Sequence, residues 1–354
     1  MIEVNRQGEV WIFAEQEDGK LSDVPLELMS KGRELADKLS VPLAAVLLAA
    51  DGGDMPAALI AQGADKVYVV IDERLGHYQA AGYGHVLCSL IEQHTPQIFL
   101  YGATPIGRDL APTVASAMKC GLTADCTDLQ IGDHKPAGSD EVHKNLLLQI
   151  RPAFGGNIIA TIVNFDRWPQ MATVREGVMP LGEPDTARSG EIVECAANLD
   201  GVQLPLEIIE SHRREKAVNL KASRIIVAGG AGVGSKDNFQ LIWDLAHCLG
   251  AAVGGSRAAI DLGFVDHDHQ IGQTGTTVRP ALYIACGISG AVQHAAGMSE
   301  AGKILAINTD ADAPIMGLAH FGIVGDLNVV IPKMIKIIRS GAGVEQAAQQ
   351  VADA

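Results

Sequence analysis

Short apolar runs alternate with helix-like patterns along the first hundred residues. The stretch from Pro25 to Leu39 has the spacing of apolar residues that predicts a helix. Strands are predicted before, after and between such stretches, at residues 10–14, 43–48, 66–71 and 97–101. Alternating strands and helices favour a parallel sheet covered on both faces. We therefore expect an α/β fold that begins with a doubly wound parallel-sheet domain.

The pattern changes after Gly121. Residues 145–150 and 158–163 predict neighbouring strands joined by a turn at 152–157, which adds a β segment to the first domain. A proline-marked, charged stretch follows from about 205 to 222 and is typical of a linker. The sequence thus predicts an N-terminal α/β domain over residues 1–210, a linker over 211–222 and a second domain over 223–354.

In the second domain each predicted strand ends in a polar or glycine-rich turn. The strands are expected at residues 225–228, 251–253, 282–285, 304–307 and 323–324. A helix after the first of them is expected to bury Phe239, Ile242, Leu245 and Leu249 on one face. The carboxyl ends of parallel strands share one edge of a Rossmann-like, doubly wound sheet. Six polar residues should therefore converge there: Ser256, Arg257, Ser289, His294, Asn308 and Asp326.

The stretch 270–294 carries the strongest chemical signal. Residues 270–277 form a loop rich in amides and hydroxyls, and residues 282–294 predict a strand, a glycine turn and a helix with Ser289 as its N-cap. The free N–H groups of such a helix start can hold a phosphate or another anion. A donor-rich loop with few charges suits a large polar cofactor, so we predict a cofactor site.

Composition narrows the class of protein. The net charge of −15 has no basic block, which argues against nucleic acid as a partner. No apolar run approaches the ~20 residues of a membrane span, and the start lacks a signal peptide, so we expect a cytoplasmic protein. The six cysteines form no Cys-x-x-Cys pair, and Asp266–His269 is interpreted as a solvated loop, so no metal site is predicted. Hydrolase and kinase motifs are missing.

The site region resembles the flavin-binding region of the α subunits of electron transfer flavoproteins. Segments 270–275, 282–294, 306–308 and 313–315 stand in that family's order and spacing, and the resemblance extends upstream to 107–112 and 151–157. It implies one FAD in the C-terminal domain and a heterodimer with a β subunit that packs on the N-terminal domain. Such a heterodimer relays electrons between a flavin dehydrogenase, typically an acyl-CoA dehydrogenase, and other redox partners. The chain itself would make no bonds on a substrate.

The resemblance also implies roles for individual residues. Arg257 would lie beside the isoalloxazine and favour its negatively charged reduced form, Thr274 would donate to flavin N5, and His294 would face the N1–C2=O edge. Gln270 and Gln273 would bind the ribityl chain or ring edge, Asn308 the adenosine end, and Asp326 the adenosine end or the ribose. The full predicted cofactor-binding set is Ser256, Arg257, Gln270, Gly272, Gln273, Thr274, Gly275, Ser289, Gly290, Ala291, Val292, Gln293, His294, Asn308, Asp326 and Leu327.

The chain departs from the family pattern at two positions. Ala231 stands where the family usually carries an arginine, so a charged contact to the ADP portion of the cofactor is absent or supplied elsewhere. Thr276 stands where many relatives have a basic residue, so the positive field at the ring is weaker or comes from elsewhere. The loop 229–235 is not a clean Gly-x-Gly-x-x-Gly and is interpreted as scaffolding.

Within the family, a shuttle and an NADH-dependent bifurcating mode, with ferredoxin or flavodoxin as one acceptor, both exist. Residues 10–16 resemble versions from anaerobes and favour bifurcation. A stand-alone NAD-dependent dehydrogenase and a nucleotide-sensing module remain as other classes. The dehydrogenase would need a clean fingerprint and an acidic ribose-binding residue, and the sequence has neither at the usual distance.

Overall fold

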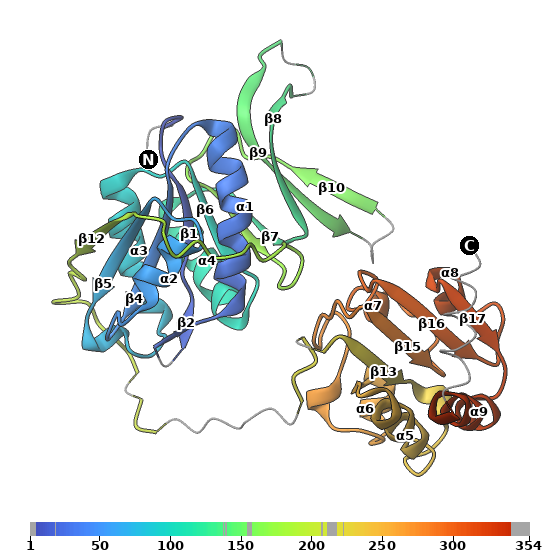
Figure 1. Ribbon diagram of the computed structural model, residues 1–354. Helices are drawn as coiled ribbons and strands as arrows, with labels where there is room; N and C mark the ends of the chain where they lie inside the picture. The colour runs from blue at the N-terminus through green and yellow to red at the C-terminus, as the bar shows by residue number, and fades with distance from the viewer. Residues whose placement is uncertain are drawn as a thin grey trace. The chain divides into compact units, whose positions relative to one another are not determined.

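The computed structural model describes residues 5–17, 19–136, 138, 140–153, 158–206, 208–210, 218–221 and 223–340. The chain divides into two compact units, Met1–Ser211 and His212–Ala354, which Figure 1 draws in blue to green and in yellow to red. The predicted linker, 211–222, and the predicted turn, 152–157, lie for the most part outside the described residues.

The first unit contains the predicted parallel sheet, here with seven strands whose neighbours all pair in parallel. The four strands predicted from the apolar runs all form. Three further strands were not predicted: β7, β11 and β12. The order across the sheet is β12 (Glu191–Cys195), β5 (Lys66–Ile71), β4 (Leu43–Ala49), β1 (Val10–Phe13), β6 (Ile98–Gly102), β11 (Gln170–Val174) and β7 (Leu122–Cys126).

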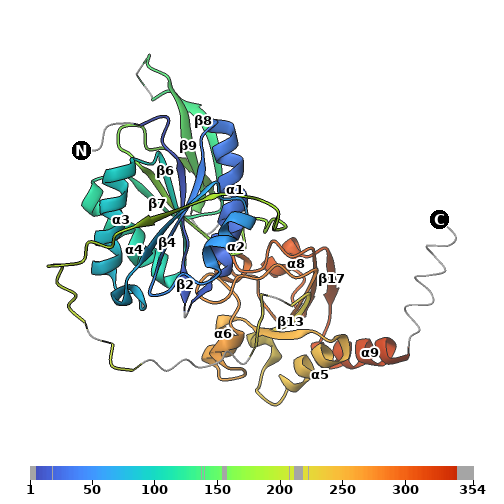
Figure 2. The same ribbon diagram turned by 60° about the vertical axis from the view of Figure 1, so that its left-hand side comes forward.

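Helices cover both faces of this sheet, as Figures 1 and 2 show. Successive strand residues point to opposite faces, so Val10 and Ile12 pack in the core beneath one pair of helices while Trp11 and Phe13 pack beneath the other. The first pair is α1 (Asp23–Leu39) and α2 (Met55–Ala61); the second is α3 (Ala80–His94) and α4 (Pro105–Met118). The minor elements are the hairpin β2 (Gln16–Glu17) and β3 (Lys20–Leu21) and the short 3₁₀ helix η1 (Glu73–Leu75).

The predicted β segment is a separate three-stranded antiparallel sheet of the first unit. Its order is β10 (Ile158–Ile162), β9 (His143–Ala153) and β8 (Asp128–His134). Figure 1 shows these strands projecting beside the parallel sheet.

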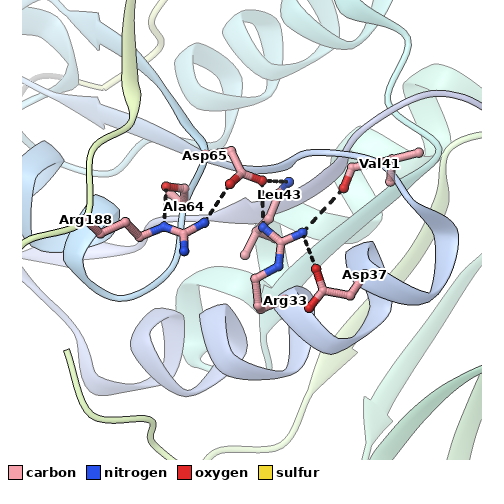
Figure 3. A network of polar contacts seen from close by, with 7 residues as sticks. All are labelled: Arg33, Asp37, Val41, Leu43, Ala64, Asp65 and Arg188. Atoms are coloured by element: carbon pink, nitrogen blue, oxygen red, sulfur yellow. Dashed lines mark hydrogen bonds and ion pairs between the residues drawn. The ribbon is translucent and has the colours of Figure 1, made fainter. Parts of the chain in front are cut away.

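A carboxylate clamp explains why the unpredicted strand β12 joins the sheet edge (Figure 3). Asp65 Oδ2 accepts hydrogen bonds from Arg33 Nη1 of α1 at 2.6 Å and from the Leu43 N–H at 2.9 Å. Asp65 Oδ1 accepts from Arg188 Nη2 at 2.6 Å, three residues before β12 begins. The clamp fixes the segment that leads into β12, so the strand is placed by long-range contacts.

The second unit is built on a five-stranded parallel sheet, which confirms the predicted α/β class. Its order is β14 (Ala252–Gly255), β13 (Ile225–Gly229), β15 (Leu282–Cys286), β16 (Lys303–Asn308) and β17 (Phe321–Val324). From β13 the chain goes outward to β14 on one side and returns to β15 on the other. This reversal opens a crevice at the carboxyl ends of β13 and β15, where ligands bind in open α/β sheets.

The two faces of this second sheet are covered differently, as Figure 1 shows. One face packs on α5 (Gln240–Leu249), α6 (Arg257–Asp261) and α9 (Leu327–Ser340), and the predicted Phe239, Ile242 and Leu245 are buried there. The other face packs on Ile271 and Val278 of the loop formed by residues 270–278, called the long loop below, near α7 (Val292–Ala295) and α8 (Pro314–Leu318). The remaining short elements are η3 (Ala231–Val233) and η4 (His267–His269). No helix among the described residues is long and apolar enough to cross a membrane.

Candidate functional site

A cavity of about 620 Å³ lies at the carboxyl edge of the second sheet. This volume is within the usual range for small-molecule and cofactor sites. Eleven of the residues predicted to bind a cofactor line it: Ser256, Arg257, Gln270, Gly272, Gln273, Thr274, Ser289, Ala291, Gln293, His294 and Asn308. The strand ends and the long loop are thus brought together by the fold as the pattern of polar turns predicts.

Five residues of the predicted set do not line this cavity: Gly275, Gly290, Val292, Asp326 and Leu327. Asp326 accepts a hydrogen bond from the Asn328 N–H at 2.8 Å at the start of α9. Gly290 has φ +86°, and a Cβ there would lie 2.2 Å from the Ile315 nitrogen, so this glycine shapes the backbone behind the wall. Contact with a cofactor stays a prediction for all sixteen residues, those that line the cavity and these five alike.

The helix expected to begin at Ser289 begins later. Helix α7 starts at Val292, has Ala291 as its N-cap and is only four residues long. The Ser289 carbonyl instead accepts the Ile315 N–H at 3.0 Å, and the positive φ of Gly290 holds the chain out of helical conformation. The prediction that Ser289 caps the helix was therefore wrong, although Ser289 lies on the cavity wall.

Glycines bring two loops of the cavity wall into direct backbone contact. The Gly232 N–H donates to the Gly287 carbonyl at 2.9 Å, and the Gly230 N–H donates to the Cys286 carbonyl at 2.9 Å. A Cβ on Gly232 would lie 2.8 Å from the Gly287 oxygen. Ala231 and Gly232 both line the cavity, so the loop taken as scaffolding is part of the wall itself. A bound group can approach such a wall closely because no side chain intervenes.

The polar side chains of the cavity are held in place by their own hydrogen bonds. Gln270 is 5% exposed, and its Nε2 donates to Thr274 Oγ1 at 3.0 Å, which leaves the Thr274 hydroxyl proton for an acceptor in the cavity. Ser256 Oγ caps α6 by accepting the Ala259 N–H at 3.3 Å. Asn308 Nδ2 donates to the Ile288 carbonyl at 2.9 Å. Such preorganised donors and acceptors orient a polar ligand.

His294 is buried and uncharged. Its Nδ1 lies 3.1 Å from the Ile271 carbonyl and its Nε2 lies 3.0 Å from the Tyr283 hydroxyl. A carbonyl can only accept, so we assign the proton to Nδ1, and Nε2 then accepts from Tyr283. Burial lowers the pKa of His294 to about 4, although the Ile271 carbonyl acts in the opposite direction. The ring therefore brings no positive charge to the cavity near neutral pH.

The formal positive charge at the cavity rests on Arg257. Among the described residues that line the cavity it is the one arginine or lysine, and it stands exposed at the first position of α6. Its Nε lies 3.6 Å from Asp261 Oδ2, four residues later. Asp310 adds a second carboxylate to the lining. Neither Asp261 nor Asp310 was predicted to lie at the site; Asp261 follows Arg257 by four residues, and this helical spacing was the signal that could have indicated it.

The cavity residues fit a large cofactor with polar and apolar parts. Buried hydroxyl, amide and imidazole groups from Ser256, Gln270 and His294 lie beside an exposed backbone surface at Gly232 and Gly287. Buried polar groups of this kind are retained where they orient a ligand. The site thus has the donor-rich, weakly charged chemistry that the sequence predicts.

Comparison with known families agrees with this assignment. Residues 10–200 match the model of the electron transfer flavoprotein domain, and residues 219–299 match the model of the electron transfer flavoprotein FAD-binding domain. The second match includes the loop and most of the residues of the cavity. FAD is thus the cofactor of the second unit, and the stand-alone NAD-dependent alternative is not favoured.

Relatives that match over nearly their full length are described as electron transfer subunits. The chain is 48% identical over 337 residues to the electron transfer flavoprotein subunit alpha of Thermoanaerobacterium thermosaccharolyticum, covering 95% of this chain and 99% of the relative. Identity to the protein of the same description from Clostridium acetobutylicum is 47%, covering 94% and 97%. It is 40% to the acryloyl-CoA reductase electron transfer subunit beta of Anaerotignum propionicum, covering 96% and 98%. The chain belongs to the α-subunit family of electron transfer flavoproteins.

Proposed function

We propose that this chain pairs with an electron transfer flavoprotein β subunit and relays electrons between an acyl-CoA-type flavin dehydrogenase and a second redox partner. The observation that carries the proposal is the cavity of the second unit, whose loop and strand-end residues fall within the match to the FAD-binding domain. The relative described as an acryloyl-CoA reductase electron transfer subunit supports the choice of dehydrogenase. We place this activity in the cytoplasm.

In this proposal FAD supplies the redox chemistry, and the chain supplies position and potential. Arg257 stabilises negative charge that develops on reduction, and the free hydroxyl proton of Thr274 serves as a hydrogen-bond donor. His294 acts as a neutral group that holds the loop through Ile271. Asp261, paired with Arg257, weakens the local positive field.

To test this, the chain is produced with and without its β subunit. We expect the two subunits to purify together when they are produced together, and one FAD per α chain to be released when the purified heterodimer is denatured. Electron flow is then measured from a reduced acyl-CoA dehydrogenase to a dye acceptor. An α chain without FAD would contradict the cofactor assignment, whereas FAD without electron flow would contradict only the choice of dehydrogenase.

NADH-dependent bifurcation is the second candidate. The resemblance of residues 10–16 to versions from anaerobes favours it, and relatives such as that of Clostridium acetobutylicum come from anaerobic bacteria. The purified heterodimer, with its dehydrogenase and NADH, is expected to reduce ferredoxin or flavodoxin only while the α,β-unsaturated acyl-CoA that accepts electrons at the dehydrogenase is also present. Reduction of that unsaturated acyl-CoA without reduction of ferredoxin or flavodoxin would identify a simple shuttle.

A further inference from the structure

The loop that carries Thr274 is attached on both sides to regular structure. On one side the Ile271 N–H donates to the Gly255 carbonyl at the end of β14 at 2.9 Å. On the other side the Gln273 N–H donates to the Gln293 carbonyl of α7 at 2.7 Å. The position of Thr274 in the cavity therefore depends on how closely residues 270–278 can approach the segment that contains α7.

Gly297 lies where the two segments pack closely enough to leave no room for a side chain. It is buried just after α7, and its carbonyl accepts the Val278 N–H at 2.9 Å. A Cβ at this position would lie 2.5 Å from both the nitrogen and the Cα of Gly272. Backbone atoms cannot move aside as the end of a long side chain can, so any residue larger than glycine must displace the loop.

Gly272 meets the same segment from the opposite direction. Its φ of +144° favours glycine, and a Cβ there would lie 2.9 Å from the Gln293 carbonyl oxygen. The contact between Gly272 and Gly297 is thus a direct backbone-to-backbone packing. Thr274 follows Gly272 by two residues, and within the loop the Thr276 N–H donates to the Gln270 carbonyl at 2.8 Å. A shift at Gly272 is therefore passed on to Thr274.

We propose that Gly297 is a positioning residue of the flavin site, which sets the place of the Thr274 hydroxyl by letting the 270–278 loop pack directly against the segment after α7. This role rests on FAD binding in the cavity. Gly297 does not line the cavity, but in this role it influences the redox properties of the bound cofactor.

The matched pair of variants is Gly297→Ala and Gly317→Ala. Gly317 lies in α8 of the same unit, and a Cβ there meets nothing within 4 Å, so its substitution adds a methyl group without displacing backbone. In the FAD-free full-length chain, we expect Gly297→Ala to speed amide exchange at Gln273, Thr276 and Val278 at least about tenfold. Its affinity for FAD should fall about tenfold. Gly317→Ala should leave both quantities at the wild-type value.

A double-variant cycle separates positioning from a general loss of structure. Thr274→Val and Gly297→Ala should each lower the midpoint potential of the bound flavin, and the double variant should have the potential of Thr274→Val alone, because Gly297 acts through Thr274. Additive shifts, or unchanged exchange in Gly297→Ala, would overturn the proposal. If Gly297→Ala fails to fold, as judged by exchange at the β13 and β15 amides, the wild-type protein without FAD decides. Free exchange at Val278 would then show that the loop is not docked there.

The outcome is distinguishable from failure of the cofactor assignment. The FAD content of the wild-type chain is measured first, and the exchange experiment does not involve the cofactor. A wild-type chain without FAD would contradict the assignment of the site, whereas a docked loop with an unshifted potential would contradict only the role of Gly297.

Discussion

The hydroxyl of Tyr283 lies 3.0 Å from Nε2 of His294; both residues are buried, and His294 lines the cofactor cavity. Burial raises the pKa of Tyr283 well above its usual value, so the phenol stays protonated and its O–H donates a hydrogen bond to the imidazole. Since Nδ1 of His294 faces the Ile271 carbonyl, both nitrogens are satisfied in the neutral form. Acid must break this arrangement, because a protonated ring carries two donors and Tyr283 would have to become an acceptor.

The stability of the second unit should therefore fall as the pH drops. The folded pKa of His294 is about 4, whereas an unfolded histidine titrates near about 6.5. Between these values the unfolded chain binds more protons, so the free energy of unfolding decreases from pH 6.5 toward pH 4, by about 3 kcal/mol at most. Urea-dependent amide exchange at the β13 and β15 strands measures it. The His294→Gln variant should lose this part of the pH dependence, and an equally steep wild-type and variant profile would contradict the assignment.

The positive charge of Arg257 should raise the midpoint potential of the flavin, and the negative charge of Asp261 should lower it. The Arg257→Gln variant should lower the midpoint potential, because a cation near the ring stabilises negative charge on reduction. Asp261→Asn should raise it, since the carboxylate 3.6 Å from Arg257 offsets that cation. Both side chains are exposed, so screening limits each shift to on the order of 30 mV for a two-electron couple. Spectroelectrochemistry at low and high salt measures the effect. Shifts of the same sign in the two variants would show that charge is not the cause.

The hydroxyl of Thr274 should matter more than its size. Thr274→Val keeps the shape but removes the proton that the Gln270 contact leaves available, so the potential of the flavin should fall and FAD should bind several-fold more weakly. Thr274→Ser keeps the hydroxyl and should stay near the wild type in both respects. Titration of the FAD-free chain and potentiometry measure the two quantities. If valine and serine behave alike, the donor role is excluded.

In the first unit, loss of the Asp65 carboxylate should release the segment that leads to β12. Burial alone would raise the pKa of Asp65, but the hydrogen bonds from the Leu43 N–H and from Arg33, together with the charges of Arg33 and Arg188, leave that pKa lowered. Its stabilisation is present above the unfolded pKa of about 3.9 and is lost as the pH falls below it.

At pH 7 we expect Asp65→Asn to cost about 1–2 kcal/mol, because Asp65 is partly exposed and the contacts are partly screened. Asp37→Asn is the matched control, since Asp37 contacts the same Arg33 from an exposed position and should cost below about 0.5 kcal/mol. Exchange at the β12 amides should quicken only in the Asp65 variant (Figure 3).

Several local features could be predicted from the sequence because they depend on neighbours along the chain. The apolar run at residues 43–48 predicted a strand, and it forms β4. The helical spacing of Phe239, Ile242 and Leu245 predicted that they share a buried face, and they pack in one core cluster at α5. Five of the six polar residues expected to meet at the strand ends line one cavity, because parallel strands of one sheet end at a common edge, whereas Asp326 does not line it. The order and spacing of the motifs in residues 270–294 were enough to indicate the family.

Other features depended on contacts between distant residues. β12 joins the sheet through Arg188 and Asp65, which are 123 positions apart. Ser289 does not cap a helix, because the positive φ of Gly290 keeps the chain out of helical conformation and α7 begins only at Val292, while the Ser289 carbonyl accepts from the distant Ile315 N–H. The neutral state of His294 follows from its burial, which lowers its pKa against the opposing effect of the Ile271 carbonyl, and no local pattern contains that burial. The sequence by itself determined the strands with continuous apolar runs, the cofactor loop and the family, since these are encoded by short-range periodicity and motif, but it did not determine β7, β11 or β12. Only the tertiary structure decided whether His294 is charged, which residue precedes α7 as its N-cap, and where a methyl group added to a glycine would collide with other backbone. These properties depend on solvent exclusion and on distances of a few ångströms between remote segments.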